Sequence, residues 1–353
     1  MDAERLFPLI SRIPLLSTPV RAHEAEDDIE ASLNAWALRG QLVSAGPAYD
    51  RFQAHRFGFL ASHTFPDAKA DDVVLWAQWL AWLVVLEDSH EDGKSDVGKR
   101  TLSGVLAGRR DRKGLSPIDK ALRELWTATA PRSGPAWRRR FVGKLDLHQA
   151  ACANEAANRR RGRLLSPSEY VVLRRGTFGA YLFDLIEAVL RTEVPARMLA
   201  TSTWRTLYEG SIDVSAWFAD IASFAPDQAA EDTHNMVYVA AKAFGMPPTA
   251  AIDWVGERII ERCAQMRAAV LTLPGLFDRC GYDRPTATYL SRVACTLLTL
   301  PRAYFEWLLT SARYTERDPN VTIPRQANAD TTTLRRAGAG HEATAGRAVA
   351  TRR

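Results

Sequence analysis

The sequence contains almost none of the patterns that indicate β-strands. Alternating β-branched runs joined by Asn-Gly or Asp-Gly turns are nearly absent from its 353 residues, whereas apolar residues recur at intervals of three and four. Neither a long interdomain linker nor an internal repeat is visible. We therefore expect an all-α protein, a single bundle of about ten helices around a central cavity. The expected helices span residues 27–43, 48–62, 70–90, 96–109, 117–130, 136–159, 167–191, 200–223, 228–244, 248–271 and 284–316.

Closely spaced cysteines and membrane-length apolar runs are also lacking. The four cysteines, at 152, 263, 280 and 295, have neither CxxC nor metal-ligand spacing. The most apolar run, Val73 to Leu86, has 14 residues and includes Gln78, whereas spanning a bilayer takes about 20. No charged-then-apolar leader opens the chain. We therefore expect a cytoplasmic protein without a transmembrane segment, in which residues 73–86 form a buried helix.

Positive charge is confined to one end of the chain. The net charge is +5, and the segment from Pro324 onward contains six arginines against two acids, which leaves the rest of the chain near +1. That segment has no aromatic residue and no apolar periodicity, so it cannot bury enough surface to fold. We expect an N-terminal segment at 1–22, one helical domain at 23–317 and a disordered basic tail at 318–353. A nucleic-acid partner is not expected, because the body is nearly neutral and has no recognition motif.

Four carboxylates follow the buried helix. Helical spacing places Glu87 beside Glu91, and Asp88 beside Glu91 and Asp92. Such a cluster repels itself and lies at the negative end of the helix dipole, so a hard cation such as Mg²⁺ would stabilise it. A solvated helix end is the alternative.

This stretch resembles the aspartate-rich DDxx(D/E) motif of bacterial class I terpene synthases. An aromatic residue, here Trp82, commonly lies five positions before the first acid of that motif. Glu87 stands where aspartate is usual, and Asp88 and Glu91 match the remaining acids. The resemblance implies the class I terpenoid synthase fold, in which the central cavity is the active site.

Two later segments resemble the parts of these enzymes that bind diphosphate. Tyr170 begins a Tyr-xxx-Arg-Arg-x-Thr segment, which makes Arg174 the expected diphosphate sensor, with Thr177 and Phe178 on the following turn. Gly176 and Gly179 destabilise this helix, so they indicate either a break facing the cavity or a packing notch. Nearer the end, Trp307 and the pair Arg313-Tyr314 match the C-terminal Trp and Arg-Tyr pair of the family. An arginine can donate two hydrogen bonds to phosphate.

The second metal motif of the family, Asn-Asp-xx-Ser-xxx-Glu, is altered in this chain. Ala219 replaces its asparagine and Asp227 replaces its glutamate, while Asp220 and Ser223 are retained. Alanine cannot bind a metal, but Asp220, Ser223 and Asp227 share one helical sector, so Asp220 could substitute as a ligand. Pro226 predicts that the helix ends or kinks before Asp227. We expect a weakened second site.

The resemblance implies a terpene cyclase that ionises an isoprenyl diphosphate with up to three diphosphate-bridged Mg²⁺ ions. Farnesyl diphosphate is the first expected substrate and geranylgeranyl diphosphate the second; a homodimer is possible in this family. The alternative is a synthase-like protein that binds an isoprenoid or a partner without turnover. A chain-elongating prenyltransferase is a weaker alternative, because no second DDxxD motif follows residue 200. Aromatic residues that could line the pocket, or simply fill the core, are Trp79, Trp82, Phe178, Trp217, Phe218 and Trp307.

Overall fold

The computed structural model describes residues 6–91, 102–107, 115–230 and 232–315, all within one compact unit, Met1–Asp318. All regular structure in these residues is helical, which confirms the all-α prediction. The α-helices are α1 (Leu6–Ser11), α2 (Glu26–Arg39), α3 (Pro47–Ala54), α4 (Phe57–Thr64), α5 (Ala70–Glu91), α6 (Leu102–Leu106), α7 (Pro117–Thr129), α8 (Pro135–Arg161), α9 (Pro167–Thr177), α10 (Tyr181–Val189), α11 (Ala196–Leu199), α12 (Ser202–Ala229), α13 (Met236–Phe244), α14 (Pro248–Arg279), α15 (Arg284–Thr310) and α16 (Ala312–Thr315). A single 3-10 helix, Ala130–Arg132, follows α7.

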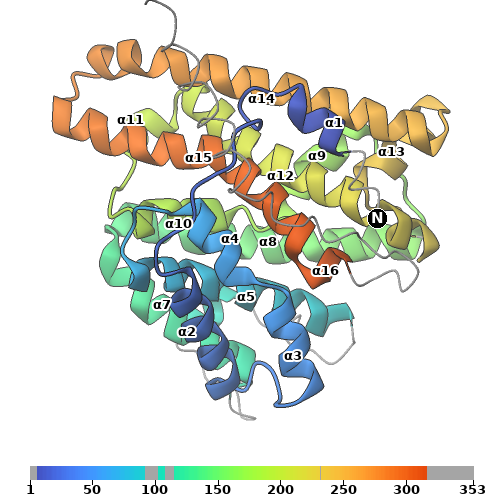
Figure 1. Cartoon of the computed structure of the whole chain (residues 1–353), viewed down its shortest axis with the longest axis horizontal. Coiled ribbons are helices and arrows are strands. Elements are labelled where there is room, and N and C mark those ends of the chain that lie inside the picture. The colour runs from blue at the N-terminus through green and yellow to red at the C-terminus, as the bar shows by residue number, and fades with distance from the viewer. Residues whose placement is uncertain (1–5, 92–101, 108–114, 231, 316–353) are drawn as a thin grey trace, which may run out of the picture. The chain divides into compact units, whose positions relative to one another are not determined.

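Helix α5 lies inside the bundle because it is apolar on all sides. It packs against α2, α4, α7 and α10 (Figure 1). At its start, the buried Asp72 accepts hydrogen bonds from Arg132 and Arg191, which satisfies a charge that would otherwise be costly to bury. Because four helices pack against α5, the carboxylates at its far end are held on a rigid element.

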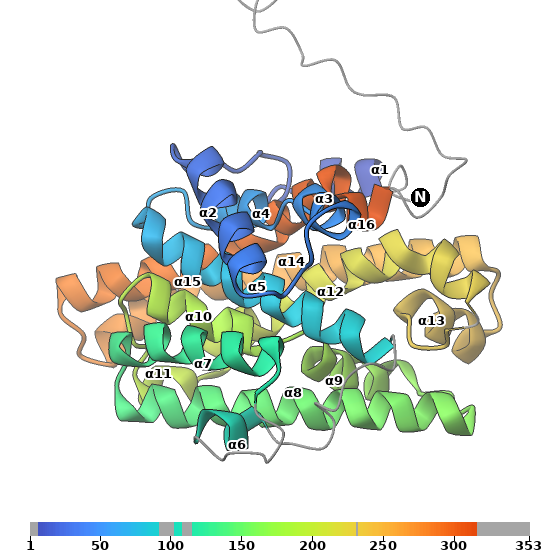
Figure 2. The same ribbon diagram turned by 90° about the horizontal axis from the view of Figure 1, so that it is seen from below.

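The C-terminal half packs around α12, which contacts α9, α13, α14 and α15. Helices α14 and α15 run beside each other over part of their length (Figure 1). On another side of the bundle, the long helix α8 contacts α6, α9 and α10 (Figure 2). The helices that carry the predicted motifs, α5, α9, α12 and α15, therefore belong to one connected core.

Side-chain caps explain several helix starts. Ser116 and Ser166 each form a capping box with the acid three residues later, Asp119 and Glu169, and a proline follows each serine. Asn235 caps α13 by accepting a hydrogen bond from the backbone N–H of Val237. These caps account for the agreement between predicted and observed starts at α7 and α9.

Three predicted helices are each divided in two; one of them, 284–316, is interrupted at Ser311, between α15 and α16. The expected helix 48–62 is interrupted at Arg56, which has a left-handed φ of 52°, and 167–191 is interrupted at Gly179, with a φ of 76°. The expected helix 228–244 begins only at Met236, because α12 extends to Ala229. Part of the expected helix 96–109 lies outside the described residues.

Pro226 predicted that the helix ends or kinks before Asp227, and the predicted end is wrong. Helix α12 continues through Pro226 to Ala229, and the carbonyl of Pro226 accepts a hydrogen bond from the N–H of Ala230. The proline removes one backbone N–H, but the backbone stays helical for three more residues. Asp227 therefore stays on the same helix as Asp220 and Ser223.

Among the described helices, none has the length and apolar character that crossing a bilayer requires. The apolar run 73–86 is buried protein core, as its interrupted pattern predicts.

Candidate active site

The end of α5 carries the first two predicted metal ligands. Arg313 on α16 donates from Nη1 to Asp88, at 3.1 Å from Oδ1 and 3.4 Å from Oδ2. The Asp88 side chain is 46% exposed and that of Arg313 is 15% exposed, so the carboxylate remains open to solvent on one side. The side chain of Glu91, and Asp92 altogether, lie outside the described residues.

Arg174, the predicted diphosphate sensor, is already held by a carboxylate. Its Nη2 lies 2.8 Å from Oδ1 of Asp220 on α12. The Nε atom of Arg174 is buried and has no hydrogen-bond partner among the described residues. A buried donor without an acceptor is unfavourable, so the arginine keeps one donor ready for an anion.

Asp220 is saturated by donors from the protein. Besides Arg174, it accepts from the hydroxyl of Tyr170 at 2.8 Å and from the backbone N–H of Met236 at 3.0 Å. Its side chain is almost fully buried. Burial raises the pKa of Asp220 while these partners oppose the shift; burial also disfavours the charged form of Arg174, but Asp220 raises the pKa of Arg174 above its usual value. Asp220 is thus arranged as an anchor for Arg174, and a metal at Asp220 would have to displace these donors.

Both arginines act electrostatically on Glu87. Burial raises the pKa of Glu87 to about 7, Arg313 and Arg174 act to lower it, and Asp88 and Glu155 act to raise it. Glu155, on α8, was missed by the sequence analysis because no motif marks it. Its charge also acts on Arg174 and Tyr170. Four predicted residues, from α5, α9 and α16, therefore lie in one electrostatic cluster.

The altered second motif forms a closed hydrogen-bonded group. Ser223 donates to Oδ2 of Asp227 at 2.6 Å, and Nδ2 of Asn235 donates to the same oxygen at 2.9 Å. The orientation of the Asn235 amide follows from its cap, since Oδ1 accepts from Val237. Ala219 is buried and contributes no polar atom. On this side of the site, the Asn235 amide therefore donates to the carboxylate of Asp227.

The predicted pocket aromatics fall into two groups. Trp79 and Trp82 are fully buried, and their indole N–H groups donate to the hydroxyl of Thr129 and to the carbonyl of Ile118, both in α7. These contacts assign both tryptophans to the core under α7. Trp217 and Phe218 are also buried, and Phe218 packs on Phe305.

A second aromatic group lies beside the arginines. The guanidinium of Arg174 lies 5.3 Å from the centre of the Phe178 ring, which contacts Tyr304 edge-on with ring centres 5.5 Å apart. The Tyr304 ring also contacts Trp307, with ring centres 5.3 Å apart, and Trp307 contacts Tyr314, with ring centres 5.6 Å apart. Tyr304 was not predicted as a site residue.

Of the two roles that the sequence left open for the glycines after Arg174, the structure shows the packing notch at Gly176, and at Gly179 a helix break that lies against a side chain. A Cβ at Gly176 would lie 2.6 Å from Cβ of Ala151 on α8, so this position is a packing notch. Gly179 breaks the helix in the left-handed region and lies against Leu83 of α5. Thr177 is buried, and its hydroxyl bonds to the carbonyl of Arg174 in the preceding turn.

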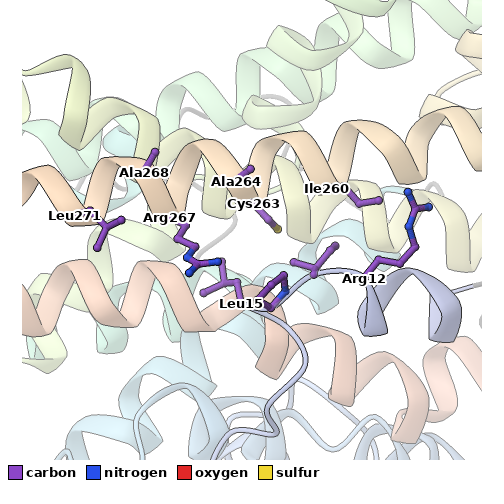
Figure 3. A pocket seen from close by; sticks show the side chains of 10 residues that line it. Arg12, Leu15, Ile260, Cys263, Ala264, Arg267, Ala268 and Leu271 are labelled. Atoms are coloured by element: carbon purple, nitrogen blue, oxygen red, sulfur yellow. The ribbon is translucent and has the colours of Figure 1, made fainter.

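A cavity of about 300 Å³ lies elsewhere, between residues 12–15 and one face of α14 (Figure 3). None of the predicted site residues lines it. Its walls are mostly apolar, with Arg12 and Arg267 among the lining residues, and Arg12 is paired with Glu257. Within the described part of the chain, no three His, Cys, Asp or Glu side chains form a metal-binding group.

The chain is similar in sequence to known proteins. Residues 78–265 match the family described as terpene synthase family 2, C-terminal metal binding. The chain is 29% identical over 291 residues to (-)-delta-cadinene synthase of Streptomyces clavuligerus, covering 79% of this chain and 88% of that protein. It is 23% identical over 300 residues to pentalenene synthase of Streptomyces exfoliatus, covering 81% and 87%.

Solved structures give the same fold. Linalool/nerolidol synthase from Streptomyces clavuligerus, in complex with 2-fluorogeranyl diphosphate, is similar with a TM-score of 0.75 at 23% identity, covering 81% of this chain and 99% of that one. Germacradien-4-ol synthase from Streptomyces citricolor has a TM-score of 0.71 at 21% identity, with coverages of 82% and 95%.

Proposed function

Because the chain belongs to terpene synthase family 2, we propose that it ionises an isoprenyl diphosphate with Mg²⁺ and cyclises the resulting carbocation to a terpene. The observation that carries this proposal is that Arg313 donates to Asp88 and is linked to Arg174 through contacting aromatic side chains, while both arginines act electrostatically on the buried Glu87. Two cations beside two carboxylates are what a metal-bound diphosphate needs, because the metal pairs with the acids and the phosphate oxygens pair with the arginines.

The arginines act on the leaving group. When the allylic C–O bond breaks, both bonding electrons leave with the diphosphate, and negative charge accumulates on its oxygens. The unpartnered Nε of Arg174 and the guanidinium of Arg313 would donate to those oxygens. Donors fixed before the reaction stabilise this charge without reorganising. Tyr314 would add a hydroxyl donor.

The residues of α5 fit a divalent cation. The half-exposed carboxylate of Asp88 offers oxygen ligands, and the raised pKa of Glu87 means that burial disfavours its charge until a cation compensates. Glu91 and Asp92 are the further predicted ligands at this helix end. Bound Mg²⁺ supplies a Lewis acid that neutralises the departing diphosphate. On α12, Ser223 and Asp227 are the remaining candidate metal ligands. Both already form hydrogen bonds: Ser223 donates to Asp227, and Asp227 also accepts from Asn235.

The carbocation would then be enclosed by aromatic rings. Phe178, Tyr304 and Trp307 lie next to the arginines, and ring faces stabilise positive charge without supplying a nucleophile. Farnesyl diphosphate is the first candidate substrate, since a relative from Postia placenta, 26% identical over 264 residues, is named sesquiterpene synthase 6. Geranylgeranyl diphosphate is the second.

The test is turnover of defined substrates. Purified protein is incubated with Mg²⁺ and each of the C10, C15 and C20 diphosphates, and the extracts are analysed by mass spectrometry. We expect a cyclic terpene that requires metal and is lost in Arg174→Ala but kept in Arg160→Ala, a change at an exposed position on α8. Product formation by Arg174→Ala at the wild-type rate would contradict the proposed role of this arginine.

One observation favours the alternative, a synthase-like protein that binds without turnover. Ala219 supplies no ligand, and the amide of Asn235 bonds to Asp227 where a metal ligand is expected. Under this alternative, the protein binds inorganic diphosphate with Mg²⁺ but forms no product from any of the three substrates.

A further inference from the structure

Tyr304 is a buried side chain that no predicted motif includes. It lies on α15, three residues before Trp307, and is 7% exposed. Its hydroxyl lies 3.2 Å from the hydroxyl of Tyr314, and its ring contacts both Phe178 and Trp307. Burial raises the pKa of Tyr304 well above its usual range, although Arg174 and Arg313 act to lower it. Tyr304 therefore stays a neutral hydroxyl, beside that of Tyr314.

The helix that carries Arg313 and Tyr314 depends on such contacts. Helix α16 has only four residues, and a helix of this length is unstable by itself. Two side-chain hydrogen bonds hold these residues in place: Arg313 bonds to Asp88, and Tyr314 bonds to Tyr304. If Asp88 binds a metal and Arg313 turns to the diphosphate, the first contact is given up. Of these two hydrogen bonds, the one to Tyr304 is then the one that remains.

The direction of the hydroxyl pair follows from chemistry. Each tyrosine has one O–H to donate. If Tyr314 donates its proton to a phosphate oxygen, its own oxygen is free to accept from Tyr304. Donation by Tyr304 polarises the Tyr314 O–H and strengthens its bond to the anion.

We propose that Tyr304 is a positioning residue of the diphosphate site, which orients Tyr314 through its hydroxyl and whose ring, between Phe178 and Trp307, forms part of the aromatic wall of that site. The inference rests on the proposed diphosphate site. Its two parts predict different outcomes: the hydroxyl affects binding of the diphosphate, and the ring affects which products form.

Binding is tested without turnover, by calorimetric titration of the full chain with inorganic diphosphate in saturating Mg²⁺. Tyr304→Phe removes one hydroxyl and keeps the ring, and we expect it to weaken binding about fivefold, the value of one hydrogen bond. Tyr314→Phe should weaken binding at least as much, and the double variant should be no worse than Tyr314→Phe. Tyr289→Phe, at an exposed position on the same helix, is the matched control. Unfolding temperatures verify that each variant is folded.

Wild-type affinity in Tyr304→Phe, or losses that simply add in the double variant, would overturn the role of the hydroxyl. The ring is tested in a turning-over enzyme: Tyr304→Leu should change the ratio of products, whereas Tyr304→Phe should keep the ratio and raise KM. An unchanged ratio in Tyr304→Leu would overturn the role of the ring. A wild type that binds diphosphate but makes no terpene would refute the cyclase and leave the binding test intact.

Discussion

Replacing Asp220 with asparagine separates the two roles that this residue could have. The variant keeps the side-chain shape but removes the charge opposite Arg174, and it presents an N–H donor to a site that receives three donors, from Arg174, Tyr170 and Met236. Removing one partner of a buried ion pair costs about 3 kcal/mol. For a chain of this size, that corresponds to a fall in Tm of roughly 4 to 5 °C.

The assay is thermal unfolding without metal, followed by titration with inorganic diphosphate in saturating Mg²⁺. The matched control is Asp213→Asn, which breaks another buried pair on α12, between Asp213 and the arginines 175 and 262. Both variants should lose stability, but only Asp220→Asn should weaken diphosphate binding, because Arg174 is no longer held. An Asp220→Asn protein with wild-type Tm and a higher Mg²⁺ requirement would refute the anchor role and identify Asp220 as a metal ligand.

Three further predictions concern the carboxylates. Asp88→Asn should abolish ionisation of the substrate but change the free energy of unfolding by less than about 1 kcal/mol, because the pair with Arg313 is half exposed; a wild-type rate of product formation would exclude this helix end as the metal site. Glu87 has a folded pKa of about 7, above its ordinary 4.5, so the metal-free folded state binds the proton more tightly than the unfolded state and its stability should fall as pH rises between these values. Thermal unfolding at several pH values should show a weaker fall in Glu87→Gln, and identical slopes would contradict the shift. Ala219→Asn combined with Asp227→Glu restores the usual ligand types and should lower the Mg²⁺ concentration for half-maximal activity; no change would mean that the geometry of α12, rather than its ligand types, limits the second site.

The helices were largely predictable because their apolar periodicity is strong and their starts carry capping residues. The break at Arg56 was not, since an arginine at positive φ has no local sequence signal. The helix end predicted from Pro226 was wrong for a related reason. The prediction considered only the missing N–H of the proline, whereas α12 stays helical to Ala229 in the folded chain.

The site shows the same division. Arg174, Arg313 and the acids of α5 were recognised as motif residues, and the structure brings four of them into one cluster. Tyr304 lies in a stripe of apolar residues on α15 and was therefore indistinguishable from core. The anchoring of Arg174 by Asp220 also depends on partners far apart in the sequence, Tyr170 and the backbone of Met236. The type of a residue shows whether it could bind a metal or a phosphate, but its hydrogen-bond partners in the fold determine whether its polar atoms are still available.

The two arginines of the site are held in different ways, and the difference bears on how a diphosphate would be bound. Arg174 is tied to a buried carboxylate that two other groups also hold, so the pair can persist when an anion arrives at Nε. Arg313 is tied to Asp88, which is 46% exposed. A metal would compete for Asp88 at the same moment that its diphosphate offers Arg313 a new partner. Both exchanges would then favour the same state. Under the proposed function, Arg174 would be preorganised for the leaving group, whereas Arg313 would be released to it only when metal and substrate bind together.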